Sequence, residues 1–259
     1  MSYSIHMPLS LQEALDLKRK TGGTYLGAGT VILVNHRHEK DLISLEKIPG
    51  LSSIEESEDY VKIGSLVTFD ELENSPVVKK KLPALWQAAY NTAGPQIRNR
   101  ATIGGNIGCF SPASDAVTAL MALDAELELF DGATKRVKLE NTDSLSNEAI
   151  ISAVYVPKRY GFSAFEKVGK RSAMSVSVLN MAIARDKDGV RLAIGCAAPK
   201  VLLCKATSET LSRKPLDLTE AEKCLLSEIH PIDDRWGTVS YRRAVAVNLL
   251  KKLVKESGL

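Results

Sequence analysis

The sequence predicts an α+β protein with two domains, residues 1–160 and residues 161–259. The chain has 259 residues, which exceeds the roughly 100 to 200 residues of a usual single domain. Segments with strand periodicity and segments with helix periodicity both occur along the whole chain. The clearest linker signal is the sequence PKRYG at 157–161, where a proline and a glycine flank charged residues.

With 44% hydrophobic and 25% charged residues, the composition is that of an ordinary globular chain. A formal net charge of +3 is too small to indicate a nucleic-acid partner. No apolar run approaches the ~18 residues that a membrane span needs. The first residues, MSYSIHMPLS, lack the basic and apolar segments of a secretory signal. The expected location is therefore cytoplasmic.

The cysteines and histidines do not have the spacing of a metal site. The cysteines form no C-x-x-C pair, so neither a zinc site nor a cysteine-bound iron–sulfur cluster is predicted. His36 and His38 stand two residues apart among charged neighbours, which is more typical of a solvated loop than of a metal site. The four cysteines are Cys109, Cys196, Cys204 and Cys224.

Near the N-terminus, a helix and a strand lead into a glycine loop. Ser10 and Glu13 form a capping box, and apolar residues continue at helical spacing until Gly22 and Gly23 end the helix. A short strand at 25–26 then runs into Gly-Ala-Gly-Thr, a turn that suits a phosphate. The third glycine and the later acidic residue of a Rossmann fold are missing, which argues against that fold.

The region that follows reads as two strands and then several helices. A second capping box, Thr-Phe-Asp-Glu, opens the first of these helices, and two prolines divide the rest. The expected elements are strands 42–45 and 60–66, a short helix after Thr68, and helices 77–82 and 85–93, which Gly94 and Pro95 end.

The stretch NRATIGGNIGCFSPASD, residues 99–115, carries the strongest local signal of a binding site. Gly104 and Gly105 allow the main chain to come close to a ligand. Thr102 and Asn106 place short polar groups on either side of them. The same residues are also typical of an ordinary turn, so the pattern alone does not decide between the two interpretations.

The end of this stretch predicts the start of a helix. Ser111 is read as the N-cap and Pro112 as the first helical residue, followed by a buried helix at 116–123. The N-terminus of a helix presents free N–H groups and a positive dipole end, which suit a phosphate. Many helices that begin with Ser-Pro bind nothing. The basic residues Arg98 and Arg100 could steady phosphates, but they are more typical of solvated loop charges.

The rest of the chain continues with strands, hairpins and two helices. Asp131-Gly132 and Asp188-Gly189 mark the hairpin turns, and a third capping box begins at Thr219. The expected elements are strands 126–130, 136–139, 150–156, 161–168, 177–185 and 190–196, a helix at 219–229 and a last helix from Ser240 onward.

Four segments of the chain resemble segments of the FAD subunits of molybdenum hydroxylases. This family includes the medium subunits of bacterial xanthine and carbon monoxide dehydrogenases. The four segments are ATIGGNI, SPASD, a helix that ends LMALDA, and YRRAVAVNLLKKLV, and the resemblance covers the whole chain. It implies an FAD-binding domain of the vanillyl-alcohol-oxidase/PCMH type at 1–160. A smaller CO-dehydrogenase-flavoprotein C-terminal-like α+β domain is implied at 161–259.

The resemblance also implies which residues contact FAD. The loop at 27–34 matches one that wraps the pyrophosphate, Ile150 lies near a backbone contact to the adenine side, and Lys167 matches a position close to the flavin ring. Because a carboxylate repels a pyrophosphate, Asp115 is expected to accept a hydrogen bond from a ribose hydroxyl or to cap backbone amides. The implied FAD-binding residues are Gly27, Ala28, Gly29, Thr30, Val31, Ile32, Leu33, Val34, Thr92, Ala93, Thr102, Gly105, Asn106, Asp115, Ile150 and Lys167.

Each of these assignments has a structural alternative. The loop at 27–34 also reads as a plain turn between a strand and a helix. Asp115 also reads as an acidic residue in the first turn of a helix, where the dipole favours it. Lys167, whose charge would help to stabilise a reduced anionic flavin, also reads as a member of a surface salt bridge.

The chain shows no catalytic set of its own, so its chemistry is expected to come from a cofactor. By resemblance, it is the FAD subunit of a three-component hydroxylase. Electrons from a large molybdenum-cofactor subunit pass through the [2Fe-2S] clusters of a small subunit to FAD, and then to NAD or another acceptor. The alternatives are a freestanding FAD-dependent oxidoreductase, with Cys109 as a candidate for covalent attachment, and a flavin-free assembly subunit.

Overall fold

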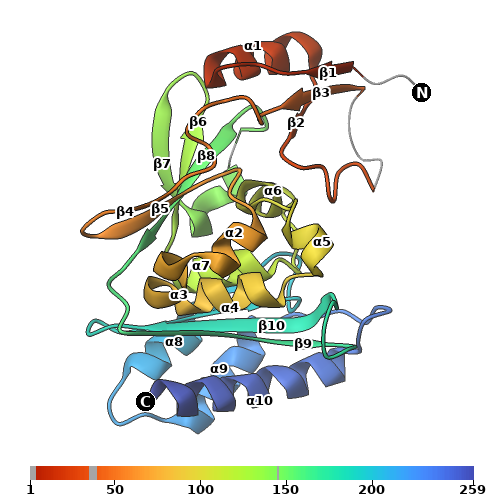
Figure 1. Ribbon diagram of the computed structural model, residues 1–259. Coiled ribbons are helices and arrows are strands. Elements are labelled where there is room, and N and C mark those ends of the chain that lie inside the picture. The colour runs from red at the N-terminus through yellow and green to blue at the C-terminus, as the bar shows by residue number, and fades with distance from the viewer. Residues whose placement is uncertain (1–3, 35–39, 145) are drawn as a thin grey trace.

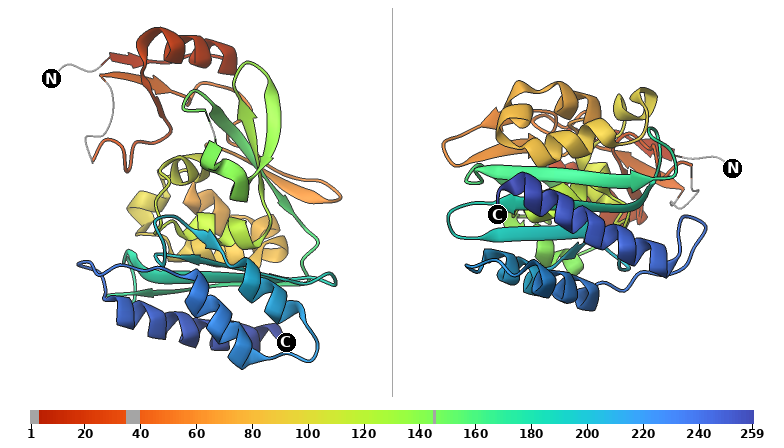
Figure 2. Two further views of the ribbon diagram at one scale, coloured as in Figure 1. Left: turned by 180° about the vertical axis from the view of Figure 1, so that it is seen from behind. Right: turned by 90° about the horizontal axis from the view of Figure 1, so that it is seen from below.

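The computed structural model describes residues 4–34, 40–144 and 146–259, and it stacks sheets and helices in layers (Figure 1). A small sheet with one helix forms the N-terminal end, and a five-stranded sheet follows. A layer of helices separates this sheet from a four-stranded sheet, whose outer face is covered by the C-terminal helices (Figure 2). The predicted α+β class is confirmed.

The N-terminal layer is a parallel sheet of three short strands in the order β1-β3-β2. Its helix begins where the capping box predicts, because the Ser10 hydroxyl accepts a hydrogen bond from the backbone N–H of Glu13 at 3.1 Å. Gly22, with a φ of 69°, ends the helix in the left-handed conformation. The elements are β1 (Ser4–His6), α1 (Leu11–Thr21), β2 (Thr24–Leu26) and β3 (Asp41–Ser44).

The five-stranded sheet is antiparallel and has the order β4-β5-β8-β6-β7. One face alternates buried apolar residues toward the helices, as Leu127 and Leu129 show. Gly132, with a φ of 109°, makes the predicted hairpin turn. The elements are β4 (Ile54–Glu56), β5 (Tyr60–Gly64), β6 (Glu126–Phe130), β7 (Thr134–Lys138), β8 (Ile150–Pro157) and the 3₁₀ helix η1 (Leu139–Ser144).

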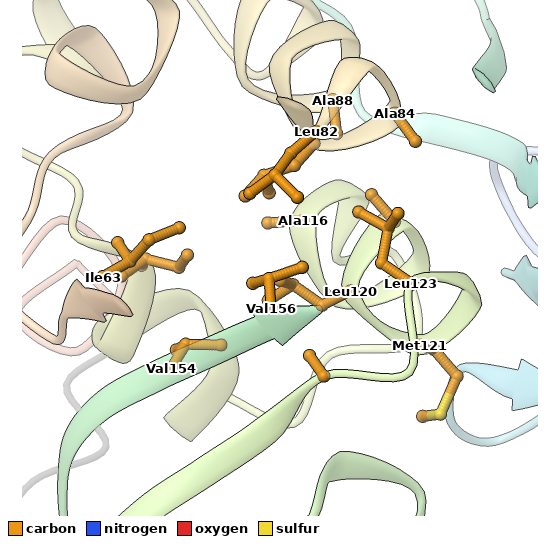
Figure 3. Close-up of a cluster of buried hydrophobic side chains, with 14 of the residues drawn as sticks. Ile63, Leu82, Ala84, Ala88, Ala116, Leu120, Met121, Leu123, Val154 and Val156 are labelled. Atoms are coloured by element: carbon orange, nitrogen blue, oxygen red, sulfur yellow. The ribbon is translucent and has the colours of Figure 1, made fainter. Parts of the chain in front are cut away.

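The central helices bury their apolar faces against this sheet. Figure 3 shows Leu120 beside Val156 and Val154 of β8, with Leu82 across from them. Thr68 and Glu71 form a complete capping box, and Pro83 separates two helices as predicted. The helices are α2 (Phe69–Asn74), α3 (Pro76–Lys81), α4 (Pro83–Asn91), α5 (Pro95–Arg98) and α7 (Asp115–Ala122).

The C-terminal layers are an antiparallel sheet, in the order β12-β11-β10-β9, and three helices. Helices α8, α9 and α10 pack on the outer face of this sheet and make a core of their own with it. The elements are β9 (Phe162–Gly169), β10 (Ser177–Arg185), β11 (Val190–Gly195), β12 (Leu202–Leu203), α8 (Lys205–Ser212), α9 (Leu218–Glu228) and α10 (Val239–Ser257).

The inner face of the four-stranded sheet belongs to the same core as the central helices. Phe165, Ala182 and Ala193 are buried in one cluster with Leu120 and Leu85 of the preceding part of the chain. The PKRYG sequence at 157–161 is where the chain crosses from β8 to β9. The two halves of the chain are therefore joined by a shared apolar interface as well as by this crossing segment.

Several local predictions are wrong. Gly104 and Gly105 lie in a short helix, α6 (Ile103–Gly108), so the alternative interpretation of them as an ordinary turn is wrong. The helix predicted after Ser111 begins three residues later, with Ser114 as its N-cap. The Ser111 hydroxyl instead accepts a hydrogen bond from Ala113 N at 3.2 Å, which stabilises a turn before the helix.

The other corrections concern helix ends and short elements. The cap of α9 is Asp217, which accepts from Glu220 N at 3.0 Å, so the Thr219 capping box is also wrong. Elements that the pattern did not predict are β1, β4, α5, α6, α8, η1 and β12, and most of them are too short to show a period. Within the described residues, no helix has both the length and the apolar character that a membrane crossing requires.

Candidate FAD site

The loop at 27–34 lies against the start of α6, although the two segments are far apart in the sequence. A Cβ atom placed on Gly27 would lie 2.9 Å from the Thr102 hydroxyl oxygen. This contact has room only for glycine, so it fixes how closely the two segments approach. Figure 1 shows the loop after β2 descending toward α5 and α6.

Within the loop, Gly29 adopts a φ of 73°, a left-handed conformation that other residues rarely take. Leu33 N donates to Gly29 O at 3.2 Å, which closes the loop on itself. Val31, Leu33 and Val34 expose between 42% and 71% of their surface. Such exposed apolar side chains beside a glycine loop fit a segment that a ligand covers.

The two glycines of α6 have different surroundings. Gly104 lies directly on Ser65, since its N–H donates to Ser65 O at 2.8 Å and a Cβ on it would lie 2.6 Å from Ser65 Cβ. Gly105 is exposed, and a Cβ on it would meet nothing nearer than the Thr102 hydroxyl at 3.0 Å. Gly104 therefore serves packing, whereas Gly105 leaves the outer side of α6 open.

The amide of Asn106 gives an independent indication of a ligand. Its Oδ1 atom is buried without a hydrogen-bond partner within the described structure. A buried acceptor without a partner is costly, and a ligand hydroxyl or N–H is a suitable donor for it. The unpartnered Asn106 oxygen and the open side of Gly105 belong to the same short helix and therefore fit a cofactor such as FAD.

Asp115 and Lys167 form a buried ion pair between the two halves of the chain. Lys167 Nζ lies 2.6 Å from Asp115 Oδ2, and the two side chains are 10% and 6% exposed. Asp115 Oδ1 also accepts from Ser177 Oγ at 2.6 Å and from Asn180 Nδ2 at 2.7 Å. Lys167 therefore forms a buried salt bridge and not a surface one, and the Asp115 carboxylate offsets the charge of the Lys167 ammonium.

Further hydrogen bonds connect this ion pair to the rest of the predicted site. Ser114 Oγ donates to Asn106 O at 3.3 Å, which links the N-terminus of α7 to α6. Lys167 Nζ also donates to Asn91 O at 2.8 Å, directly before Thr92 and Ala93. The structure thus connects α6, Asp115, Lys167 and the end of α4 in one chain of contacts.

Thr92 caps the end of α4, and Ala93 after it has an unusual conformation. Ala93 has a φ of 47°, and the carbonyl oxygens of both residues accept from Arg98 Nη1 at 3.3 Å. The Arg98 side chain is 13% exposed and lies 2.7 Å from Glu73. Arg98 is thus a largely covered residue of an ion pair, and its interpretation as a solvated loop charge is wrong.

Ile150 is the first residue of β8, a strand that contacts α6. Its side chain is 1% exposed and packs in the N-terminal core with Leu15 and Ile43. Its backbone pairs with Phe130 in the five-stranded sheet. Only the backbone of Ile150 is therefore available for a contact with a ligand.

The described structure gives no support for a metal site or for covalent attachment of a flavin to Cys109. No group of three metal-ligating side chains occurs there, and His36 and His38 lie outside the described residues. Cys109 ends α6 in an exposed position, yet partial burial of its thiol raises its pKa. A raised pKa disfavours the thiolate that covalent attachment to a flavin requires.

The environments of the cysteines predict their order of reaction. At pH 8, iodoacetamide should label Cys109 and Cys224 well before Cys196 and Cys204, which are buried. Burial raises the pKa of Cys196 to about 12, and the nearby Asp115 carboxylate adds to the shift. Only about one Cys196 thiol in 10⁴ is then ionised at pH 8. Mass spectrometry of labelled peptides checks this, and equal labelling of Cys196 and Cys224 in the folded chain would contradict it.

Comparisons with known proteins agree with a flavoprotein of two parts. Residues 1–159 match the FAD binding domain in molybdopterin dehydrogenase, and residues 163–257 match the CO dehydrogenase flavoprotein C-terminal domain. The chain belongs to this family, the FAD-binding medium subunits of molybdenum hydroxylases such as xanthine, nicotinate and CO dehydrogenases. It is an FAD-dependent oxidoreductase subunit, and the predicted fold, family and cofactor are confirmed.

Individual relatives support this over nearly the whole chain. The chain is 30% identical to a putative xanthine dehydrogenase FAD-binding subunit of Escherichia coli K12, covering 98% of this chain and 95% of the relative. It is 31% identical to the nicotinate dehydrogenase FAD-subunit of Eubacterium barkeri, covering 97% and 94%. A carbon monoxide dehydrogenase structure from Hydrogenophaga pseudoflava has a TM-score of 0.90 at 26% identity, covering 97% and 96%.

Proposed function

We propose that this chain is the FAD-carrying electron-transfer subunit of a cytoplasmic molybdenum hydroxylase with several subunits. In this proposal, a large subunit carries the molybdenum cofactor and a small subunit carries [2Fe-2S] clusters. This chain receives electrons from those clusters and passes them to NAD or another acceptor. Residues 1–160 hold most of the FAD contacts, and residues 161–259 contribute Lys167. The four free cysteines agree with a reducing compartment.

The observation that carries the proposal is the contact between Gly27 and Thr102. Two glycine-containing segments that each suit a phosphate, but are distant in sequence, converge on one place. The unpartnered Asn106 oxygen in the same short helix supports a ligand there. The hydrogen bonds that link α6, Asp115, Lys167 and the end of α4 support one shared site.

When bound, FAD supplies an isoalloxazine ring that accepts electrons one or two at a time. The residues of this chain then have binding and orienting roles. The backbone amides at 27–34 that make no hydrogen bond within the loop would hold the pyrophosphate, and Thr102, Gly105 and Asn106 would border it. Asp115 accepts a hydrogen bond from a hydroxyl, while Lys167, Thr92 and Ala93 lie on the side toward the second half of the chain.

Purification decides between this proposal and its alternatives. The chain should copurify at native expression with two partner chains, which mass spectrometry identifies, and metal analysis should find molybdenum and iron. Acid should release all of the flavin into the supernatant. A chain that purifies alone and oxidises a substrate would instead indicate a freestanding oxidoreductase, and a colourless chain that takes up no FAD would indicate an assembly subunit.

A further inference from the structure

Asn180 lies in the middle of β10, and its buried side-chain amide is flanked along the strand by apolar residues. The residue is 0% exposed, and Leu179, Met181 and Ala182 beside it are fully buried. Its Nδ2 atom donates to Asp115 Oδ1 at 2.7 Å, and its Oδ1 atom accepts from Thr118 Oγ1 at 2.8 Å. Because a carboxylate has no proton to donate, only this orientation of the amide satisfies both neighbours.

The atoms packed around the Asn180 side chain restrict its amide to a single orientation. A Cβ atom on Gly195 would lie 2.2 Å from Asn180 Oδ1 and 2.9 Å from Thr118 Oγ1. The next residue, Cys196, donates its N–H to Pro112 O at 2.8 Å and so ties β11 to the SPASD segment. The amide is thus held on one side by the backbone of β11 and on the other by α7.

The Asp115–Lys167 ion pair has hydrogen-bonding groups that its neighbours do not use. Asp115 has about four acceptor positions, of which Ser177, Asn180 and Lys167 occupy three. The Lys167 ammonium has three donors, of which Asp115 and Asn91 O take two. Among the described residues, one acceptor of Asp115 and one donor of Lys167 therefore have no partner, on side chains that are still 6% and 10% exposed.

We propose that Asn180 is a positioning residue of the FAD site. With Ser177, it fixes the rotation of the Asp115 carboxylate so that the free acceptor of Asp115 and the free donor of Lys167 meet one hydroxyl of FAD. A hydroxyl both donates and accepts, and so matches this pair, whereas a phosphate oxygen does not donate. This inference rests on the proposed function, since it assumes that FAD binds at this site.

The variant Asn180→Asp tests the role of the amide. A protonated Asp at this position still donates to Asp115 and accepts from Thr118, whereas an ionised Asp places a second carboxylate beside Asp115. Two carboxylates that share a site raise the pKa of one of them. We expect the variant to bind FAD as the unaltered chain does at pH 5.5 and about tenfold or more weakly at pH 8.5.

The other charged groups nearby do not produce the same pH dependence. Burial raises the pKa of the Cys196 thiol to about 12, which keeps it neutral over this range. Arg242 and Asp234 are paired with each other at 2.7 Å, and hydrogen bonds from Arg242 and from backbone N–H groups lower the pKa of Asp234 despite its desolvation. Asn248→Asp, the same change at an exposed position of α10, is the matched control.

Flavin fluorescence measures the affinity for FAD across this pH range, and circular dichroism follows the fold. A ratio of affinities between Asn180→Asp and Asn248→Asp that does not change with pH would overturn the inference. If Asn180→Asp does not fold at pH 8.5, Ser177→Ala decides: several-fold weaker binding supports the inference, and unchanged binding overturns it. Failure of the unaltered chain to bind FAD at any pH would instead overturn the proposed function.

Discussion

Replacing Gly105 by valine should remove most of the FAD from this chain and leave its fold nearly unchanged. Gly105 is exposed, and a Cβ added there has only the Thr102 hydroxyl oxygen as a close neighbour, at 3.0 Å. The same side chain would stand between α6 and a ligand held by the loop at 27–34. We expect the affinity for FAD to fall by about a hundredfold, which corresponds to about 2.8 kcal/mol.

Gly104→Val is the matched comparison, because it makes the same change one residue earlier. A Cβ on Gly104 would lie 2.6 Å from Ser65 Cβ and 2.7 Å from Ser65 O, and the backbone oxygen has little freedom to move. Such overpacking should cost about 3 kcal/mol or more of the free energy of unfolding. Urea denaturation and flavin fluorescence separate the two effects, and equal loss of fold and flavin in Gly105→Val would indicate a structural role for both glycines.

The sequence was a good guide to the long elements and to the family. Helix α1, the Asp131-Gly132 hairpin and the β10–β11 hairpin have strong periodic or turn signals, and all three were predicted. Helix α6 was missed because Ile-Gly-Gly-Asn-Ile-Gly has low helix propensity. It forms because the Thr102 cap and the contact of Gly104 with Ser65 hold it, and these are tertiary effects.

The hydrogen-bond network around Asp115 could be predicted only in part from the sequence. A carboxylate in the first turn of a helix could be read from SPASD, but its partners are Lys167, Ser177 and Asn180, which lie far along the chain. An Asn within the apolar run VSVLNMAIA was the signal available, since a buried amide needs hydrogen-bond partners. The sequence alone does not indicate that the partner of the Asn180 amide is Asp115.

Lys167→Met should be among the most destabilising single changes on the surface between the two halves of the chain. It removes the cation from a pair whose side chains are 10% and 6% exposed and leaves the Asp115 carboxylate buried without a counter-charge. Removing one partner of a buried ion pair costs about 3–5 kcal/mol. Urea denaturation of the FAD-free chain measures this loss as a lower midpoint at an unchanged slope.

A second pair on the same strand provides the control. Lys252 Nζ lies 2.6 Å from Glu166 Oε1, the same distance as in the Lys167–Asp115 pair, but its side chains are 48% and 30% exposed. Lys252→Met should therefore cost less than about 1 kcal/mol, because water screens an exposed pair. Equal losses for Lys252→Met and Lys167→Met would show that burial does not determine the strength of the interaction.

The double variant Asp115→Asn with Lys167→Met distinguishes the ion pair from simple packing. It removes both charges, so no unpaired charge stays buried, and an Asn at 115 still offers an oxygen to Ser177 and Asn180. We expect it to be more stable than Lys167→Met alone, with a coupling energy of about 1–3 kcal/mol. If the two losses simply add, the pair contributes no interaction of its own, and the two halves of the chain are held by their shared apolar core.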